Sequence, residues 1–148
     1  MAMSVTVREG SLDEVIALYP SIPELVQPYS KERYEAQFRD SACSLVLIAC
    51  EGDQPVGFKL GYERTADGSF YSWMGGVAQN HRQSGIAGLL LREMESWCRR
   101  QGYERLRFKT RNAHVAMLRF ALKNGFRIIG FEPAVSVDQH RIWLEKPL

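Results

Sequence analysis

Six consecutive residues, Arg82-Gln83-Ser84-Gly85-Ile86-Ala87, have the types and spacing of a diphosphate-binding loop. A strand-like stretch precedes them, and an apolar helical pattern begins at Ile86. A strand that turns into a helix directs unpaired backbone N–H groups and the positive end of the helix dipole at one spot. Gly85 lets the backbone come close to a ligand, and the small Ala87 keeps that approach clear. We therefore predict a diphosphate site formed mainly by the backbone N–H groups of Arg82, Gln83, Ser84, Gly85, Ile86, Ala87 and Gly88.

Two other glycine-containing phosphate loops fit this stretch less well. The P-loop requires G-x-x-x-x-G-K-[ST], and no Lys-Ser or Lys-Thr pair follows Gly85. The dinucleotide pattern G-x-G-x-x-G survives only as Gly85 and Gly88, without its leading Gly-x-Gly. The hexapeptide alone is equally compatible with an ordinary turn before a helix, so its interpretation depends on the surrounding elements.

Turn residues and hydrophobic periodicity predict an α/β chain around this stretch. Expected strands cover residues 5–8, 44–51, 55–64, 69–77, 106–110, 126–131 and 135–144. Expected helices cover residues 12–19, 31–38, 84–100 and 113–123. Ser11 and Ser30 are expected N-caps, and Gly102 and Gly125 should end the last two helices. This order predicts a mixed α/β sandwich in a single domain over residues 1–148.

Three further patterns within these elements lead to specific expectations. Gly75-Gly76 inside a strand indicates a bulge or a close backbone approach. Cys98 should be a core residue, since no His is placed to activate it as a nucleophile. The apolar faces of the last two helices are expected at Ile86, Leu89, Leu90, Met94 and Trp97, and at Val115, Met117, Leu118 and Leu122.

Composition limits the classes of partner and compartment. Hydrophobic residues make up 45% and charged residues 24% of the 148 residues, which is typical of a globular protein. A net charge of +2 argues against nucleic acid or an anionic membrane as the main partner. The N-terminal residues lack a targeting pattern, and no apolar run approaches the roughly 20 residues that span a bilayer. Three cysteines without metal-like spacing are expected to be reduced thiols of a cytoplasmic protein.

The stretch over residues 73–91 resembles motif A of the GNAT acyltransferase superfamily, the acetyl-CoA-dependent N-acetyltransferases. Residues 117–126 are similar to the helix of that family that ends in a Gly-Phe pair. Pro55-Val56-Gly57-Phe58 is similar to its P-V-G turn into the third strand. Together these segments span most of the chain, in the order and at the spacing of the family.

This resemblance implies a central, mostly antiparallel sheet of about six or seven strands, splayed at its middle, with about four helices. Acetyl-CoA would lie in the gap between the splayed strands, and no metal or redox cofactor is implied. The pantetheine arm would pair with the backbone at Gly76, Val77, Ala78 and Gln79. A backbone N–H near Val77 would polarise the thioester carbonyl, as acyl transfer requires because it develops an oxyanion. Arg82 and Arg92 could add positive charge.

The family also commonly uses an Asn before the fourth helix to contact the pantetheine. Asn112 lies near this place but could equally be an N-cap. Measured back from Gly125-Phe126, the family spacing falls instead on His114. Both residues are candidates for binding the cofactor.

The proton donor is the main departure from the family. Many members have a Tyr about four residues before the Gly-Phe pair, which protonates the departing thiolate, and this chain has Ala121 there. Either another residue, Tyr71 or Tyr62, serves, or the thiolate leaves unassisted. A thiol pKa of about 8.5 makes unassisted departure tolerable near neutral pH.

A base must also accept the proton of the substrate ammonium. Glu24 lies in the loop that borders the acceptor site in the family, and Glu63 ends the third predicted strand. Each could act as base or bind a cationic acceptor, although each could also be a surface carboxylate. Tyr71 and Trp73 could line the acceptor pocket.

The predicted function is therefore direct transfer of an acetyl group from acetyl-CoA to a primary amine in a ternary complex. One alternative is a CoA-binding sensor or regulatory module without catalysis, which Ala121 favours. Another is a protein that binds a nucleotide with the same loop. The acceptor is a small-molecule or peptide amine that the sequence does not identify, and a homodimer is expected only by analogy.

Overall fold

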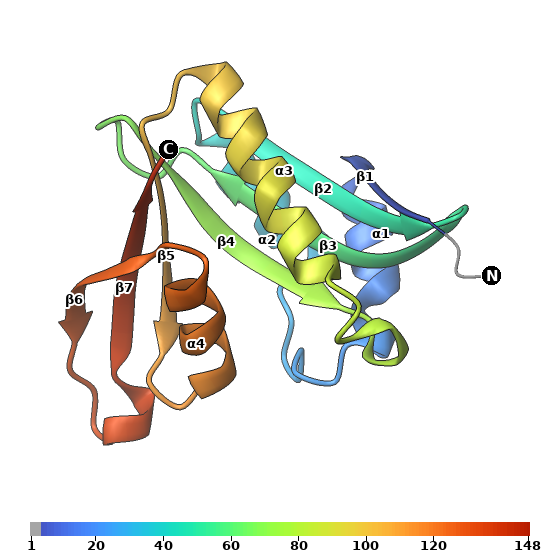
Figure 1. Cartoon of the computed structure of the whole chain (residues 1–148). Coiled ribbons are helices and arrows are strands. Elements are labelled where there is room, and N and C mark those ends of the chain that lie inside the picture. The colour runs from blue at the N-terminus through green and yellow to red at the C-terminus, as the bar shows by residue number, and fades with distance from the viewer. Residues whose placement is uncertain (1–3) are drawn as a thin grey trace.

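The computed structural model describes residues 4–148 and contains both helices and strands along the chain (Figure 1). The strands are β1 Val5–Glu9, β2 Ser44–Glu51, β3 Gln54–Tyr62, β4 Ser69–Val77, β5 Arg105–Arg111, β6 Arg127–Glu132 and β7 Arg141–Pro147. The helices are α1 Leu12–Leu18, α2 Lys31–Arg39, α3 Ile86–Gln101 and α4 Val115–Lys123. Short 3₁₀ turns cover Tyr19–Ser21, Gln79–His81 and Val137–Gln139.

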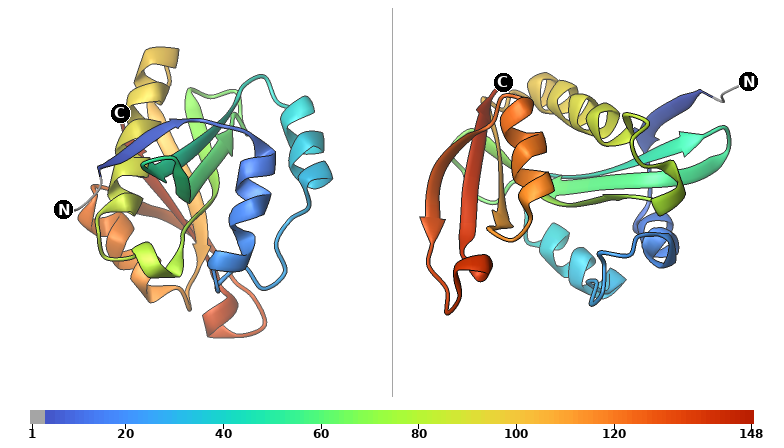
Figure 2. Two further views of the ribbon diagram at one scale, coloured as in Figure 1. Left: turned by 90° about the vertical axis from the view of Figure 1, so that its right-hand side faces the viewer. Right: turned by 60° about the horizontal axis from the view of Figure 1, so that its bottom comes forward.

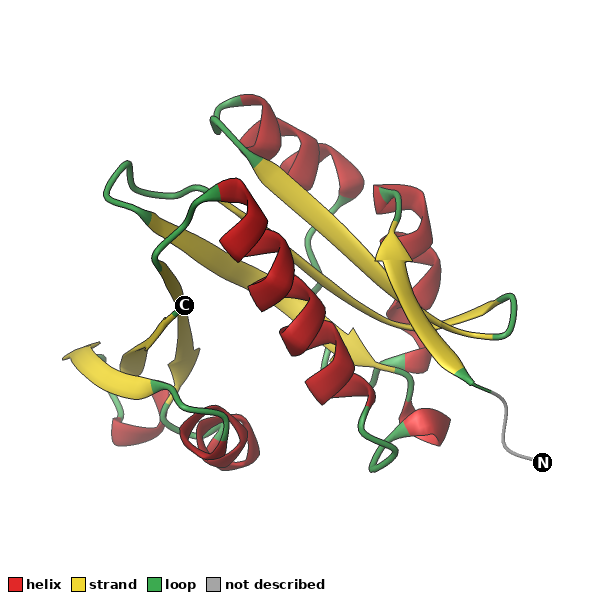
Figure 3. Cartoon of the chain, turned by 45° about the horizontal axis from the view of Figure 1, so that its top comes forward, coloured by secondary structure: helices red, strands yellow, loops and turns green. Residues whose placement is uncertain are grey.

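All seven of these strands form one sheet in the order β1-β2-β3-β4-β5-β7-β6. Neighbouring strands are antiparallel except for β4 and β5, which run parallel. The strands β5, β7 and β6 lie at an angle to the others, as the two views in Figures 1 and 3 show. The predicted fold class, a mostly antiparallel sheet with four helices, is therefore confirmed.

Helices cover both faces of the sheet (Figure 2, right). On one face, α3 and α4 pack against Phe70, Leu106 and Leu144. On the other face, α1 and α2 pack against Ile48, Phe58 and Leu60 of β2 and β3. Alternating strand residues supply the two cores, because successive side chains of a strand point to opposite faces.

The predicted helix ends are largely confirmed. The Ser11 hydroxyl accepts a hydrogen bond from the Glu14 N–H, and the Ser30 hydroxyl accepts one from the Arg33 N–H. Gly102 has φ +90° and Gly125 φ +94°, a left-handed conformation that glycine adopts without steric cost. Cys98 is fully buried, as predicted, and burial raises the pKa of its thiol to about 12.

Of the two alternatives for Gly75-Gly76, the close backbone approach is confirmed, whereas the start of the last strand needs correction. The bulge of β4 lies at Trp73, since Leu60 pairs with Met74 and Gly61 with Ser72. Gly75-Gly76 keeps a regular register, so its glycines serve the close approach instead. The last strand begins at Arg141 rather than at residue 135, because hydrogen bonds from the segment before α4 hold residues 137–140 in a turn.

The apolar faces of the last two helices also differ from expectation. In α3, Leu91 and Cys98 are buried, whereas the expected Leu89 and Trp97 are half-buried. In α4 only Ala121 is buried, whereas Val115, Met117 and Leu122 are 43–50% exposed. The helix α4 lies against the outer strands of the sheet, where less of its surface is covered (Figure 1).

Among residues 4–148, no helix is both long enough and apolar enough to cross a bilayer.

Candidate active site

The predicted diphosphate loop connects β4 to α3 and leaves the first turn of α3 open. Gln83 has φ +62° and Gly85 φ +81°, so the backbone reverses twice before the helix begins. Gly85 is the N-cap of this 16-residue helix and no side chain caps it. The first N–H groups of α3, which have no partner within the helix, are therefore available to an anion.

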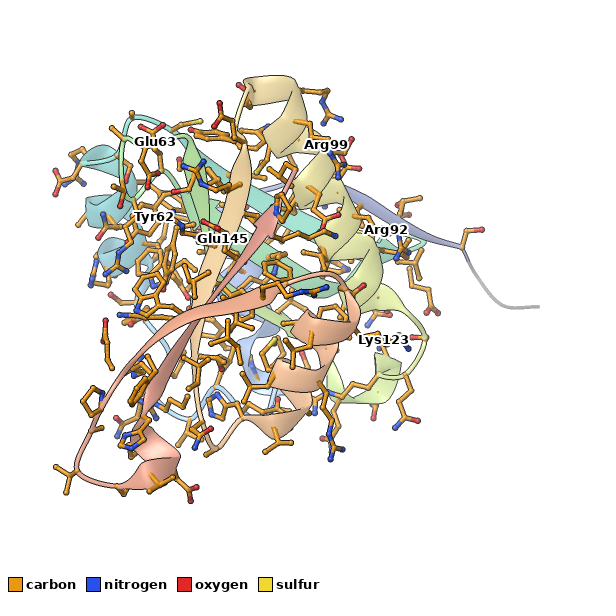
Figure 4. The ribbon with its side chains drawn as sticks, turned by 60° about the vertical axis from the view of Figure 1, so that its left-hand side comes forward. Tyr62, Glu63, Arg92, Arg99, Lys123 and Glu145 are labelled. Carbon is orange, nitrogen blue, oxygen red and sulfur yellow. The ribbon has the colours of Figure 1, made fainter. Side chains whose placement is uncertain are left out.

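Glycine is needed at position 85 for its conformation rather than for space. No atom lies within 4 Å of the place that a Cβ would take. Gly88 is different, because a Cβ there would lie 3.1 Å from Nη1 of Arg92. The Arg92 side chain therefore folds back along α3 toward the loop. Figure 4 labels Arg92 on this helix.

Arg82 is joined to Glu24 by two hydrogen bonds, one from each terminal nitrogen of its guanidinium. Its Nε donates a third hydrogen bond to the Val77 carbonyl oxygen at 3.3 Å. The bonds from Arg82 lower the pKa of Glu24. The two predicted site residues thus neutralise each other and attach the loop before α2 to the end of β4.

The strands β4 and β5 pair over only three residues, from Ser69 with Arg105 to Tyr71 with Arg107. Beyond this point they diverge, and the end of β4 has no strand on that side (Figure 1). The Ala78 N–H donates a hydrogen bond to the Val56 carbonyl oxygen of β3, with the nitrogen and oxygen 2.8 Å apart. Since successive N–H groups of a strand point to opposite sides, the N–H of Val77 points into the space between the diverging strands.

Close backbone approaches surround this end of β4. A Cβ on Gly76 would lie 3.0 Å from Cδ1 of Ile22, and one on Gly57 would lie 3.1 Å from the Gly76 carbonyl oxygen. The segment that carries Ile22 and Glu24 therefore packs directly on the end of β4. These close approaches explain why glycine occupies position 76 and position 57, the latter in the Pro55-Val56-Gly57 segment of β3.

Asn112 and His114 lie at the end of β5, across the splay from β4. The Asn112 side-chain amide donates to the Val137 carbonyl oxygen at 3.2 Å, which holds the connection between β6 and β7. His114, not Asn112, is the N-cap of α4, and its exposed ring contacts the Thr110 hydroxyl through Nδ1 at 3.2 Å.

The sheet face opposite α3 carries a cluster of aromatic side chains near the start of the splay. Tyr71 contacts the rings of Tyr62 and Trp143, with centroids 5.6 Å and 5.8 Å apart. Tyr62 also contacts Trp73, which in turn packs on Tyr34 of α2. Burial raises the pKa of Tyr71 to about 12, so its hydroxyl stays protonated at neutral pH.

Beside Tyr71 lies a cavity of about 250 Å³, bounded by Arg64, Ser69, Arg107 and Trp143. Arg64, Arg107 and Trp143 were not expected here. No local sequence signal marks them. Arg64 lies in the connection after β3, Arg107 in β5 and Trp143 in β7, and they meet only through the sheet order.

Glu63 lies near the candidates Tyr62 and Tyr71 but far from those at the end of β4. It follows Tyr62, which pairs with Tyr71, whereas Val77 pairs with Gly57 at the opposite end of β3. Six residues of strand, about 20 Å, separate Glu63 from that end. Figure 4 shows Glu63 beside Tyr62, at the end of the sheet that carries the C-terminus of β3. Ala121, at the expected tyrosine position, is buried in the core and offers no proton donor.

Comparisons with known proteins agree with this geometry. Ard1 from Thermoplasma volcanium matches with a TM-score of 0.80 and 21% identity, over 97% of each chain. The ribosomal-protein-S18-alanine N-acetyltransferase from Escherichia coli matches with a TM-score of 0.80 and 13% identity, over 97% of this chain and 94% of that one. A putative streptothricin acetyltransferase from Bacillus anthracis, in complex with acetyl coenzyme A, matches with a TM-score of 0.79 and 18% identity over 99% of each chain. At these identities the likeness concerns the fold.

A search of curated proteins found no match. The model of the acetyltransferase (GNAT) family, however, matches residues 12–126, which include the loop, the splayed strands and the Gly-Phe pair. The chain therefore belongs to the acetyltransferase (GNAT) family.

Proposed function

We propose that this protein transfers the acetyl group of acetyl-CoA to a primary amine by direct attack in a ternary complex. The observation that carries the proposal is the meeting of two sets of free backbone N–H groups at one end of β4. The first turn of α3 offers one set to a diphosphate, and Val77 offers another N–H in the space where β5 diverges. The Bacillus anthracis structure with the same fold contains acetyl coenzyme A.

The loop from Arg82 to Gly88 would bind the diphosphate of acetyl-CoA. The α3 dipole and backbone N–H groups favour an anion there, and Arg92 adds a charge beside Gly88. From the loop, the pantetheine would run along Gly76, Val77, Ala78 and Gln79, toward Asn112 and His114 on the other side of the splay.

The Val77 N–H would stabilise the negative charge that develops on the thioester oxygen. A donor that is already oriented costs no reorganisation during the reaction, and losing one such donor typically costs about 10²–10³ in kcat. Because the donor belongs to the backbone, its orientation depends on the pairing of β4 with β3.

Proton transfer would depend little on the carboxylates. Glu24 is the candidate base nearest the end of β4, but its hydrogen bonds to Arg82 lower its pKa and weaken it as a base. Glu63 lies too far along β3. We therefore infer that water accepts the amine proton. Tyr71 stays protonated at neutral pH, but it lies six residues before Val77 in β4, as far from that end as Glu63, so the thiolate would leave without a tyrosine proton donor.

The test is calorimetric titration of acetyl-CoA into the wild type, Gly85→Asp and Gly85→Asn. Asp and Asn have nearly the same shape and both tolerate positive φ, so they share the strain at φ +81° and differ in charge. We expect Gly85→Asp to weaken binding at least about tenfold more than Gly85→Asn, because the carboxylate repels the diphosphate at the α3 N-terminus.

Equal losses in both variants, or no binding by the wild type, would overturn the assignment of the loop. A non-catalytic acetyl-CoA sensor is the second candidate, favoured by the buried Ala121 at the usual position of the proton donor. Binding of acetyl-CoA without thiol release over a broad amine panel would identify the sensor.

A further inference from the structure

The cavity beside Tyr71 opens on the sheet face that an acceptor would approach. The diphosphate loop lies at the N-terminus of α3, so acetyl-CoA would reach the splay from the α3 side of the sheet. The acceptor must then come from the other face, which carries Tyr71 and Trp143. The cavity, at about 250 Å³, is slightly smaller than the 300–1,000 Å³ typical of small-molecule pockets, which suits one part of an acceptor.

Positive charge is concentrated at this cavity. The Arg64 guanidinium lies 4.8 Å from the ring centroid of Tyr71 and 5.3 Å from that of Trp143. The Lys109 ammonium lies 5.2 Å from the Trp143 ring. Both cations therefore contact the same Trp143 ring, and burial, followed by the charge of Arg64, lowers the pKa of Lys109.

Two of the carboxylates around the cavity are paired with other arginines. Asp67 and Glu145 form ion pairs with Arg105 and Arg107, at distances from 2.7 to 4.0 Å. Glu132 accepts a hydrogen bond from the Trp143 indole N–H at 2.9 Å and lies near Lys109 and Arg64 without an ion pair to either. Within the described chain, neither Arg64 nor Lys109 forms an ion pair with a carboxylate. The face therefore has cationic groups without direct anionic partners, next to aromatic rings.

We propose that the acceptor amine carries a carboxylate, which Arg64 and Lys109 bind beside Tyr71 and Trp143; this inference rests on the transferase function proposed above. A planar guanidinium that lies on two rings keeps its edge free for a bidentate carboxylate. The same cations repel an ammonium, so they discriminate against amines that lack an anionic group.

The geometry also separates the two ends of the acceptor. Tyr71 lies six residues before Val77 in β4, which corresponds to about 20 Å of strand. The Arg64 and Lys109 cations lie over the Tyr71 and Trp143 rings, so most of this span must be covered by the acceptor itself. An extended peptide of about six residues, with its N-terminal amine and C-terminal carboxylate at opposite ends, meets this requirement, whereas a single α-amino acid does not.

The experiment compares the hexapeptide pentaglycyl-phenylalanine with its C-terminal amide as acceptors, with acetyl-CoA saturating and thiol release as the readout. Rates are corrected for the fraction of unprotonated amine. We expect kcat/KM to favour the carboxylate form by about 10- to 100-fold, the effect of one or two charge-assisted hydrogen bonds. In Arg64→Gln/Lys109→Met this preference should fall below about threefold. The KM for the carboxylate acceptor should rise, while kcat should stay largely unchanged.

Arg99→Gln is the matched control, because Arg99 is an exposed cation on α3, on the other side of the sheet from Tyr62 (Figure 4). It should keep the full preference. Equal use of the two acceptors by the wild type, or the same loss in Arg99→Gln as in the double variant, would overturn the proposal. Thermal unfolding of each variant checks that the fold is intact.

Direct binding distinguishes failure of this inference from failure of the transferase function. Calorimetric titration of the acetylated product, N-acetyl-pentaglycyl-phenylalanine, and of its amide requires no catalysis. Preferential binding of the acid, lost in the double variant, would support the carboxylate site even if thiol release were absent. Equal binding of both probes, or binding of neither by a protein that binds acetyl-CoA, would refute the site and leave the cofactor assignment intact.

Discussion

At the scale of single residues, Arg82 is the point where three parts of the site meet. Its guanidinium contacts Glu24 from the loop before α2 and the Val77 carbonyl oxygen at the end of β4, and its backbone belongs to the diphosphate loop. A guanidinium has five N–H donors, and these contacts use most of them. We infer that Glu24 positions Arg82 and does not itself accept a proton.

Substitutions at these two residues test that inference. Because Arg82 lowers the pKa of Glu24, the carboxylate stays ionised through the neutral range and contributes no titration there. Glu24→Gln should lower kcat/KM less than about tenfold and leave the pH–rate profile between pH 5 and 9 unchanged in shape. Arg82→Gln should raise the KM for acetyl-CoA by about tenfold. A hundredfold fall in kcat in Glu24→Gln, with a changed profile, would instead make Glu24 the base.

At the scale of the elements, α1 shows how a local pattern specifies a helix start. Glu14 accepts hydrogen bonds from the Ser11 N–H and from Arg8 of β1, so the cap also connects the helix to the edge strand. The hydrogen bond from Arg8, followed by that from Ser11, lowers the pKa of Glu14 to about 2. The N-cap Ser11 was predicted from the sequence, whereas the contribution of Arg8 depends on how β1 meets α1.

The pKa of Glu14 predicts a pH-dependent contribution to stability. The unfolded chain, with a glutamate pKa of about 4.3, binds more protons than the folded chain between about pH 4.3 and pH 2. The stabilisation is therefore complete above pH 4.3 and is lost as the pH falls toward 2. Glu14→Gln should cost about 1 kcal/mol at pH 7, since the site is near the surface, and less at pH 3.

Urea unfolding at both pH values measures this difference. Glu35→Gln serves as the control, because Glu35 is exposed on α2 and lies 3.9 Å from its partner Lys31. It should change the free energy of unfolding by less than about 0.5 kcal/mol. A cost for Glu14→Gln that stays the same at pH 3 would show that the ionised carboxylate is not the source.

At the scale of the whole molecule, a buried ion pair connects the two halves of the splayed sheet. Glu95 on α3 is 5% exposed and accepts a hydrogen bond from Lys146 of β7 at 2.6 Å. The stem of Lys146 lies against Gly125, at the end of α4. Glu95 also faces Lys59 of β3, whose pKa burial lowers to about 8 while Glu95 raises it. One carboxylate thus interacts with strands on both sides of the divergence.

Removing this carboxylate should destabilise the whole sheet. Glu95→Gln leaves Lys146 and Lys59 without their anion. Removing one partner of a buried ion pair typically lowers the free energy of unfolding by about 3–5 kcal/mol. Glu93→Gln is the control on the exposed side of the same helix, where Glu93 pairs with Arg100 at 3.4 Å, and it should cost less than about 0.5 kcal/mol. Thermal and urea unfolding measure both. Similar small effects of the two substitutions would show that water reaches Glu95.

The amino-acid sequence by itself determined most of the helix ends and predicted the loop before α3 as a diphosphate site. Ser11, Ser30, Gly102 and Gly125 mark helix ends because caps and left-handed turns are local, and the loop before α3 consists of consecutive residues. Only the tertiary structure decided the partner of Arg82, the buried position of Glu95 and the cavity with Arg64, Lys109 and Trp143. These residues are far apart in the chain and become neighbours only through the sheet order, in which β7 lies between β5 and β6. Side-chain pairing across a sheet depends on strand order and register. The hydrophobic periodicity of a single segment specifies neither of them.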